Sequence, residues 1–87
     1  MSYQIEFSKP ALKQLEKLSL DTQERIKAKI QELADNPRPH GVVKLKNLEN
    51  NYRIKVGVYR VIYEIIDNIL LITVLKVGHR REVYRDE

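Results

Sequence analysis

The stretch of sequence that decides the fold alternates apolar and cationic side chains before a glycine and has one more cation after it: Tyr52-Arg53-Ile54-Lys55-Val56-Gly57-Val58-Tyr59-Arg60-Val61-Ile62-Tyr63. Successive side chains of a strand point to opposite faces, so the apolar residues before the glycine share one face and Arg53 and Lys55 share the other. Gly57 and Val58 suit the tight turn of a β-hairpin, because glycine adopts a positive φ without strain. The stretch predicts two antiparallel strands, with Arg60 beside Arg53 and Lys55.

The residues after this hairpin predict one more strand. Asp67 and Asn68 are typical turn residues, and they separate a strand over residues 59–66 from another over residues 69–77. Both of these strands are apolar on both faces, which is typical of central strands. We therefore expect an antiparallel meander with helices over one side of it. Residues 42–51 are mixed in character and allow a short strand and a turn.

The first 40 residues predict a strand and two helices. Apolar residues alternate with polar ones over residues 3–8, which indicates a half-buried strand. Ser8 can cap a first helix, and residues 21–24 have the pattern of a capping box that opens a second helix. Pro37 ends this second helix, because the residue before a proline is pushed out of the helical region. Two helices so close in sequence should form an antiparallel hairpin.

Apolar residues at helical spacing give each helix one buried stripe. In the first helix they are Leu12, Leu15 and Leu18, and in the second Ile26, Ile30 and Leu33. The predicted fold class is thus α+β, in a single domain over residues 1–87. An N-terminal strand comes first, followed by an antiparallel helix hairpin and then an antiparallel β-meander.

Composition and charge narrow the classes of function. The chain is 43% apolar and 32% charged, as in ordinary globular domains, and it contains no cysteine for disulfides or thiolate metal sites. The sequence contains no apolar run of 18 residues and no pattern typical of a signal peptide, so we expect a cytoplasmic protein. The formal net charge is +4, and residues 41–87 hold nine Lys and Arg against six Asp and Glu. The excess positive charge therefore lies in the predicted meander and tail.

The cations of the meander and tail are the candidate functional residues. Arg80 and Arg81 follow the last strand and should reach the edge of the face that carries the hairpin cations. Such a cluster costs stability through repulsion unless a polyanion or an acidic partner compensates it. Tyr84 can then serve as a platform on which a nucleotide base stacks. The alternative is a solvated basic face with Glu64 and Glu82 as counter-ions, and a Tyr84 that covers the edge of the core.

Other kinds of site have weaker signals. His40 lies in a proline-rich loop and should face solvent, whereas His79 lies among the tail cations and can contact a phosphate or transfer a proton. The sequence has no carboxylate pair, Ser/His/Asp arrangement, glycine-rich phosphate loop or cluster of metal ligands at the usual spacing. We therefore expect no metal and no cofactor.

The chain resembles the RelE branch of the RelE/ParE superfamily of toxins along nearly its whole length. The residues that carry the resemblance are Lys44-Leu45-Lys46, Tyr52-Arg53-Ile54-Lys55, Tyr59-Arg60-Val61-Ile62-Tyr63 and Val77-Gly78-His79-Arg80-Arg81-Glu82-Val83-Tyr84. The resemblance implies a RelE-like microbial RNase fold and the toxin of a type II toxin–antitoxin system. It also implies ribosome-dependent cleavage of mRNA in the A site, and neutralisation by a RelB-like antitoxin. The alternatives are a ParE-like gyrase inhibitor without nuclease activity, and a basic RNA-binding or protein-binding module.

The resemblance also assigns roles to individual residues. The catalytic set that it implies is Arg53, Lys55, Arg60, Arg80 and Tyr84, and the set that contacts RNA or the ribosome is Lys44, Lys46, His79 and Arg81. The sequence departs from the family pattern at two points. Position 53 is arginine where a relative has lysine, and the chain stops three residues after Tyr84 where many relatives continue into a helix.

The implied reaction uses the ribose 2′-OH of the message as its nucleophile. Lys55 is the candidate base, because neighbouring cations should favour its neutral amine. Arg53 and Arg60 should stabilise the phosphorane, since guanidinium groups match phosphate oxygens. Arg80 should protonate or stabilise the leaving 5′-oxygen, with His79 as its rival, and Tyr84 should hold a base in line.

Overall fold

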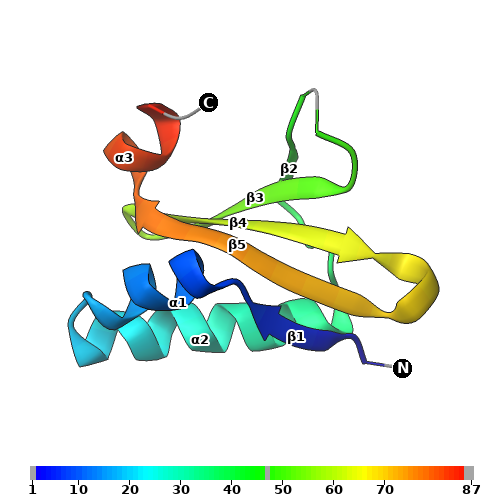
Figure 1. Ribbon diagram of the computed structural model, residues 1–87, viewed down its shortest axis with the longest axis horizontal. Helices are drawn as coiled ribbons and strands as arrows, with labels where there is room; N and C mark the ends of the chain where they lie inside the picture. Colours follow the sequence, from blue (N-terminus) through cyan, green and yellow to red (C-terminus); the bar gives the residue numbers. More distant parts are fainter. Residues whose placement is uncertain (1, 47, 86–87) are drawn as a thin grey trace.

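The computed structural model describes residues 2–46 and 48–85, and the side chains of all of these except Tyr84 and Arg85. In chain order its elements are β1 (Gln4–Phe7), α1 (Lys9–Glu16), α2 (Leu20–Asp35), β2 (Val43–Lys44), β3 (Asn51–Val56), β4 (Tyr59–Ile66), the 3₁₀ turn η1 (Asp67–Ile69), β5 (Leu71–His79) and α3 (Arg80–Arg85). This order confirms the predicted α+β class, with a strand, a pair of helices and then a meander (Figure 1).

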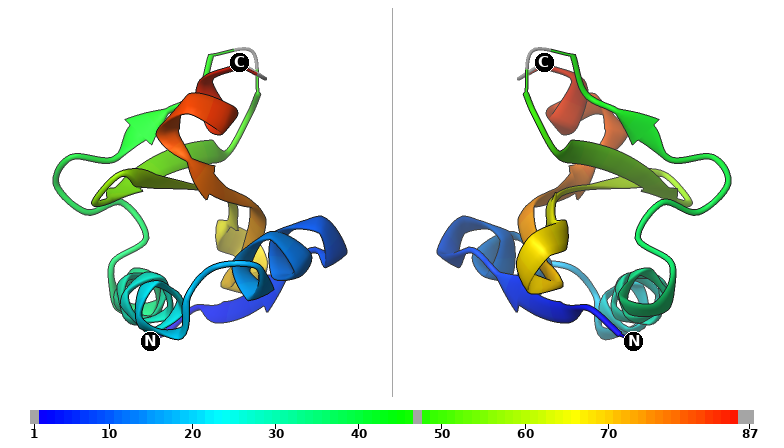
Figure 2. Two further views of the ribbon diagram at one scale, coloured as in Figure 1. Left: turned by 90° about the vertical axis from the view of Figure 1, so that its left-hand side faces the viewer. Right: turned by 90° about the vertical axis from the view of Figure 1, so that its right-hand side faces the viewer.

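The strands form one sheet in the order β1-β5-β4-β3-β2. The meander strands pair antiparallel, whereas β1 runs parallel to β5. β5 and β4 lie inside the sheet, as their apolar character on both faces predicted. Helices α1 and α2 cover one face, and α3 and the β2 segment rise from the opposite face (Figure 2). We call this second face the open face.

Serine hydroxyls begin both long helices. The Ala11 amide donates to Ser8 Oγ at 3.2 Å, as predicted for the first helix. For the second helix the predicted capping box is wrong by two residues, because α2 begins at Leu20 and the Thr22 amide donates to Ser19 Oγ at 3.3 Å. Ser19 already supplies the acceptor that the first turn needs. Asp21 lies instead within that turn, where the helix dipole favours its charge.

The core lies between the two helices and the sheet. Ile26, Ile30 and Leu33 of α2 are buried, as their spacing predicted. In α1 the buried residues are Ala11 and Leu15, so the prediction is wrong for Leu12, which is 44% exposed. Leu18 lies beyond the end of α1 and is partly buried against the core. The sheet contributes Tyr52, Ile54, Val61, Tyr63, Ile65, Ile72, Val74 and Val77 to the same cluster.

Two turns connect the meander. Gly57 has a φ of 61° in the predicted hairpin turn between β3 and β4. The second connection differs from its prediction, because η1 is followed by Leu70 at a φ of 53°, and β5 therefore runs from Leu71 to His79. A β-bulge between Ile62 and Tyr63 in the pairing register leaves Leu75 without a direct partner on β4.

The C-terminal part of β5 extends beyond the end of β1. Side chains of α1 and of its N-cap residue cover the edge of this part. Ser8 Oγ donates to the carbonyl oxygen of Leu75 at 3.2 Å. The amide of Val77 donates to Gln14 Oε1 at 2.8 Å. These two contacts satisfy backbone groups that a neighbouring strand would otherwise pair.

The basic tail forms a short helix, α3, directly after β5. The Arg80 amide donates to the Val58 carbonyl oxygen at 2.8 Å, which ties the start of α3 to the β3–β4 hairpin. Val83 is fully buried against the sheet. Gly78 permits this packing, since a Cβ at that position would lie 3.3 Å from Val83 Cγ2. The tail therefore folds back over the open face.

Candidate nucleic-acid interface

The hairpin cations share the open face of the sheet. The register places Lys55 opposite Arg60, and Arg60 opposite Gly78. Arg53 lies two residues before Lys55 and therefore on the same face. Neighbouring strands are about 4.8 Å apart, so the three residues are neighbours on this face of the sheet. The prediction that Arg53, Lys55 and Arg60 share one face is confirmed.

Arg60 is the most buried of these cations, with 5% of its surface exposed. Its Nη1 atom donates to the carbonyl oxygens of Gly57 and Tyr59, each at 2.9 Å. These bonds hold one side of the guanidinium against the hairpin turn. Lys55 beside it is exposed to solvent. The pair thus combines a fixed guanidinium with a mobile amine.

A groove of about 740 Å³ runs along the open face next to these residues. Arg53, Ile62 and Lys76 follow one another in its floor, because the register pairs Arg53 with Ile62 and Ile62 with Lys76. Residues 43–46 and Leu48 form one wall, and Val83 of α3 lines the other side. The groove therefore has a floor in which the apolar Ile62 lies between two cations, Arg53 and Lys76.

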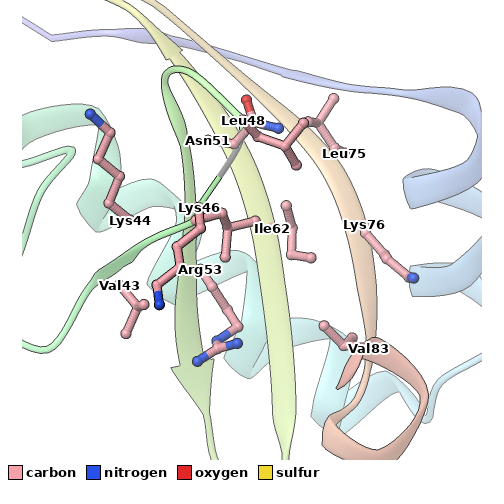
Figure 3. A pocket seen from close by; sticks show the side chains of 11 residues that line it. Val43, Lys44, Lys46, Leu48, Asn51, Arg53, Ile62, Leu75, Lys76 and Val83 are labelled. Carbon is pink, nitrogen blue, oxygen red and sulfur yellow. The ribbon is translucent and has the colours of Figure 1, made fainter. Parts of the chain in front are cut away.

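Figure 3 shows how the charged side chains lie around the groove. Lys46 and Arg53 direct their charged ends toward the same end of it, whereas Lys44 and Lys76 extend toward opposite sides. Lys76 was absent from the predicted set. The bulge at Leu75 interrupts the alternation of β5, so the face on which Lys76 lies does not follow from the sequence pattern alone.

Arg80 and Arg81 are exposed at the start of α3, next to the hairpin turn. The structure thus brings them to the same end of the sheet as Lys55 and Arg60. Tyr84 belongs to α3, but its side chain lies outside the described residues. Its stacking role stays a prediction.

His79 lies on the other face of the sheet. It pairs with Tyr59, and the two rings are T-shaped with centroids 6.0 Å apart. Tyr59 packs against the core beneath the helices, so this pair faces away from the groove. His79 Nδ1 accepts a hydrogen bond from the Arg81 amide at 3.2 Å. The geometry favours a role for His79 in holding the first turn of α3. His40 is exposed in its loop, as expected.

A second polar cluster holds the loop after α2, and it was not predicted from the sequence. Arg38 Nη2 and Asp67 Oδ2 form a salt bridge of 2.8 Å, and Arg38 Nε donates to the Tyr52 hydroxyl at 3.1 Å. The Tyr3 hydroxyl donates to Asp67 Oδ1. Hydrogen bonds from Arg38 and Tyr3 lower the pKa of Asp67 below its usual value. The bond to Asp67 in turn raises the pKa of Tyr3. These residues are far apart in the sequence, and no local pattern connects them.

No group of three or more His, Cys, Asp or Glu side chains is placed to hold a metal ion in residues 2–46 and 48–85. Within the same residues, no helix is both long and apolar enough to span a membrane.

Fold and site together define a small basic α+β protein whose cation-lined groove suits a polyanion. The family model described as the ParE toxin of the type II toxin–antitoxin system parDE matches residues 5–84. The mRNA interferase toxin RelE of Escherichia coli K12 is 34% identical over 90 residues, which cover 99% of this chain and 94% of that protein.

Solved structures agree with these matches. A double arginine-to-alanine mutant of E. coli RelE in the free state superposes with a TM-score of 0.81 at 34% identity, covering 98% of this chain and 93% of that chain. The toxin from the intact E. coli RelBE toxin–antitoxin complex superposes with a TM-score of 0.80 at 32% identity, covering 90% and 96%. The chain therefore belongs to the RelE/ParE superfamily of type II toxins. The relative and the solved structures described above are RelE proteins.

Proposed function

We propose that this protein is a ribosome-dependent endoribonuclease that cleaves mRNA in the ribosomal A site and thereby inhibits translation in the cytoplasm. One observation carries the proposal. Arg53, Lys55 and Arg60 share one face beside a groove, in a chain 34% identical to an mRNA interferase along almost its whole length. Three convergent cations can bind a phosphate and stabilise the charge that it gains in the transition state.

The proposed reaction begins with the ribose 2′-OH of the message. Lys55 takes the proton from this hydroxyl as its oxygen attacks the adjacent phosphorus. Arg53 and Arg60 donate hydrogen bonds to the phosphorane oxygens, and Arg60 is already held in place by the hairpin carbonyls. The bond from phosphorus to the 5′-oxygen then breaks, which leaves a 2′,3′-cyclic phosphate and a 5′-OH. No metal takes part in this scheme.

The tail supplies the remaining groups. Arg80 lies at the hairpin end of the sheet, where it can donate a proton or a hydrogen bond to the leaving 5′-oxygen. It is favoured over His79, which faces Tyr59 on the other side of the sheet. Tyr84 holds a base by stacking. Lys44, Lys46 and Arg81 contact RNA around the groove, and His79 contributes through the position of α3.

Primer extension on a message in a translating extract tests the proposal. With purified protein we expect discrete cuts within A-site codons, and the same message without ribosomes should stay largely intact. Efficient cutting of naked RNA that depends on an added metal ion would contradict the mechanism. Uncut message on translating ribosomes would contradict the function.

The match to the ParE family model supports a second candidate, a gyrase-inhibiting toxin without nuclease activity. The two candidates share the fold but differ in the target. The same preparation should therefore be added to a gyrase supercoiling assay. Inhibition of supercoiling together with intact message would favour the ParE-like function.

We further propose that an acidic, partly disordered RelB-like antitoxin neutralises this toxin. E. coli RelE, which has the same fold, is found with RelB in the RelBE complex. An acidic segment can order itself on the exposed cations around the groove as it binds. Because exposed charge pairs are screened by salt, its affinity should fall as ionic strength rises. A complex that is insensitive to salt and makes no contact with residues 44–60 or 79–84 would contradict this.

A further inference from the structure

Cations from three separate elements lie around the turn between β3 and β4. This turn lies at one end of the sheet, between α3 on the open face and the first half of α2 on the other (Figure 1). The residues around it are Arg25 of α2, Lys55 of β3, Val58 of the turn, and Arg80 and Arg81 of α3; we call this set the hairpin-tip surface.

Arg25 reaches the turn from the helix side. Its Nη2 atom lies 3.2 Å from the point where a Cβ on Gly57 would be. Gly57 has a φ of 61° and no side chain, so the guanidinium packs directly on the backbone of the turn. Arg60 donates to the carbonyl oxygen of the same glycine from the groove side. Positive charge therefore continues from the groove around the turn to α2.

The cations of this surface have no ion-pair partner in the part of the protein that the structure describes. Within residues 2–46 and 48–85, no ion pair or hydrogen bond holds the side chains of Arg25, Lys55, Arg80 or Arg81. Asp21, one helical turn before Arg25, forms no ion pair with it. Like charges that gather without counter-ions destabilise a fold, unless a polyanion binds there.

We propose that Arg25, on the helix side of the hairpin-tip surface, is a second RNA contact, which binds the phosphate backbone of ribosomal RNA while the groove holds the message. This inference rests on the proposed function and assigns a partner to the part of the surface that lies outside the proposed catalytic residues. A phosphate backbone needs only well-placed cations. A folded protein partner would need apolar or aromatic anchors, and the apolar side chain exposed on this turn is a single valine, Val58, at 46% exposure.

The experiment compares Arg25→Gln with Lys27→Gln. Both residues are exposed on α2 and each variant loses one positive charge, but Lys27 is not part of the hairpin-tip surface. The probe is a purified 70S ribosome with a message carrying 2′-deoxyribose at the scissile position, so that binding is measured without cleavage. Affinity is measured across a salt series, and thermal unfolding confirms that both variants are folded.

We expect Arg25→Gln to weaken ribosome binding severalfold and to lower the slope of log K against log salt by about 0.7–0.9, the value for one phosphate contact. In cleavage assays most of its loss should appear in the ribosome concentration for half-maximal cleavage, not in the rate at saturation. Lys27→Gln should match the wild-type protein in both measurements. Arg25→Lys should recover part of the slope, because a lysine keeps the charge.

Equal slopes for Arg25→Gln and Lys27→Gln would overturn the inference, and Arg25 would then only cover the turn. A loss confined to the saturating rate would also overturn it, since Arg25 would then support the turn and the catalytic residues beside it. Weaker binding of the antitoxin with unchanged ribosome binding would assign the surface to an acidic protein instead. Failure of the wild-type protein to cut ribosome-bound message contradicts the proposed function separately, because the binding slopes do not depend on cleavage.

Discussion

Arg60 combines a structural and a proposed chemical role in one side chain. Its Nη1 atom donates hydrogen bonds to two carbonyl oxygens of the hairpin. The residue also lies directly opposite Lys55 on the open face. A buried arginine with fixed hydrogen bonds loses little freedom when it binds a phosphate, so it is preorganised for that purpose. Arginine and lysine are therefore not interchangeable at this position.

Arg60→Lys should lower both stability and activity. The lysine keeps the charge but cannot bond both carbonyls and a phosphate, so we expect a loss of about 1–3 kcal/mol in the free energy of unfolding. Single-turnover cleavage should fall by more than about tenfold, which corresponds to about 1.4 kcal/mol. Urea unfolding and single-turnover cleavage measure the two effects. Arg81→Lys is the control at an exposed position, and equal behaviour of the two variants would contradict the role of Arg60.

At the level of elements, α3 is held by three contacts of different kinds. They are the Arg80 amide on the Val58 carbonyl oxygen, the Arg81 amide on His79 Nδ1, and the packing of Val83 over Gly78. Each fixes α3 relative to β5 or to the hairpin turn. These contacts hold Arg80 at the end of the sheet where Lys55 and Arg60 lie.

This arrangement predicts that changes in α3 affect chemistry more than binding. Arg80→Ala should reduce single-turnover cleavage by well over tenfold, while ribosome affinity changes little because other cations remain. Tyr84→Ala should lose a similar amount, and Tyr84→Phe much less, since stacking on a base depends on the ring. Cleavage and ribosome binding should be measured side by side. Wild-type cleavage rates in both alanine variants would place the site at the other end of the sheet.

The helices allow a separate test of where α2 begins. Ser19→Ala should destabilise the protein by about 1 kcal/mol, because the Thr22 amide loses its acceptor. Asp21→Ala should cost less, since it removes only a favourable charge from the first turn. Urea unfolding of the two variants under identical conditions measures the difference. A larger loss for Asp21→Ala would contradict Ser19 as the N-cap and would favour the capping box predicted over residues 21–24.

At the scale of the whole molecule, the cluster around Asp67 connects the β4–β5 turn with the loop after α2 and with the N-terminus. Its stabilising effect depends on pH in a definite direction. Arg38 and Tyr3 lower the pKa of Asp67 in the folded protein. The contribution is therefore complete above the unfolded pKa of about 4, and it is lost as pH falls through the folded pKa.

Asp67→Asn should accordingly reduce the free energy of unfolding at pH 7, and the gap to the wild-type protein should narrow as pH falls below about 4. Urea unfolding of both proteins at a series of pH values measures this gap. In an Arg38→Gln background the effect of Asp67→Asn should be smaller, because its principal partner is gone. A gap that is constant with pH would show that Asp67 acts through packing and not through its charge.

Only part of the architecture of the whole molecule could be predicted from the sequence. Alternation and the turn at Gly57 were enough to predict the hairpin and the shared face of Arg53, Lys55 and Arg60. Apolar residues on both faces were enough to predict the central place of β4 and β5. These features depend on near neighbours in the chain. The parallel pairing of β1 with β5, the Arg38–Asp67 cluster and the direction of His79 depend on contacts between distant residues. The bulge at Leu75 interrupts the alternation of side chains along β5. The position of Lys76 on the open face could therefore not be predicted from a periodic pattern.

The edge of β5 beyond β1 has a consequence for how this molecule behaves in a crowded solution. An uncovered strand edge invites another chain to add a strand, and repetition of that event gives aggregates. Ser8 and Gln14 already bond two backbone groups of this edge through side-chain oxygens, so these two groups are not open to the backbone of a second copy. Two polar side chains thus make this stretch of β5 a poor template for an added strand.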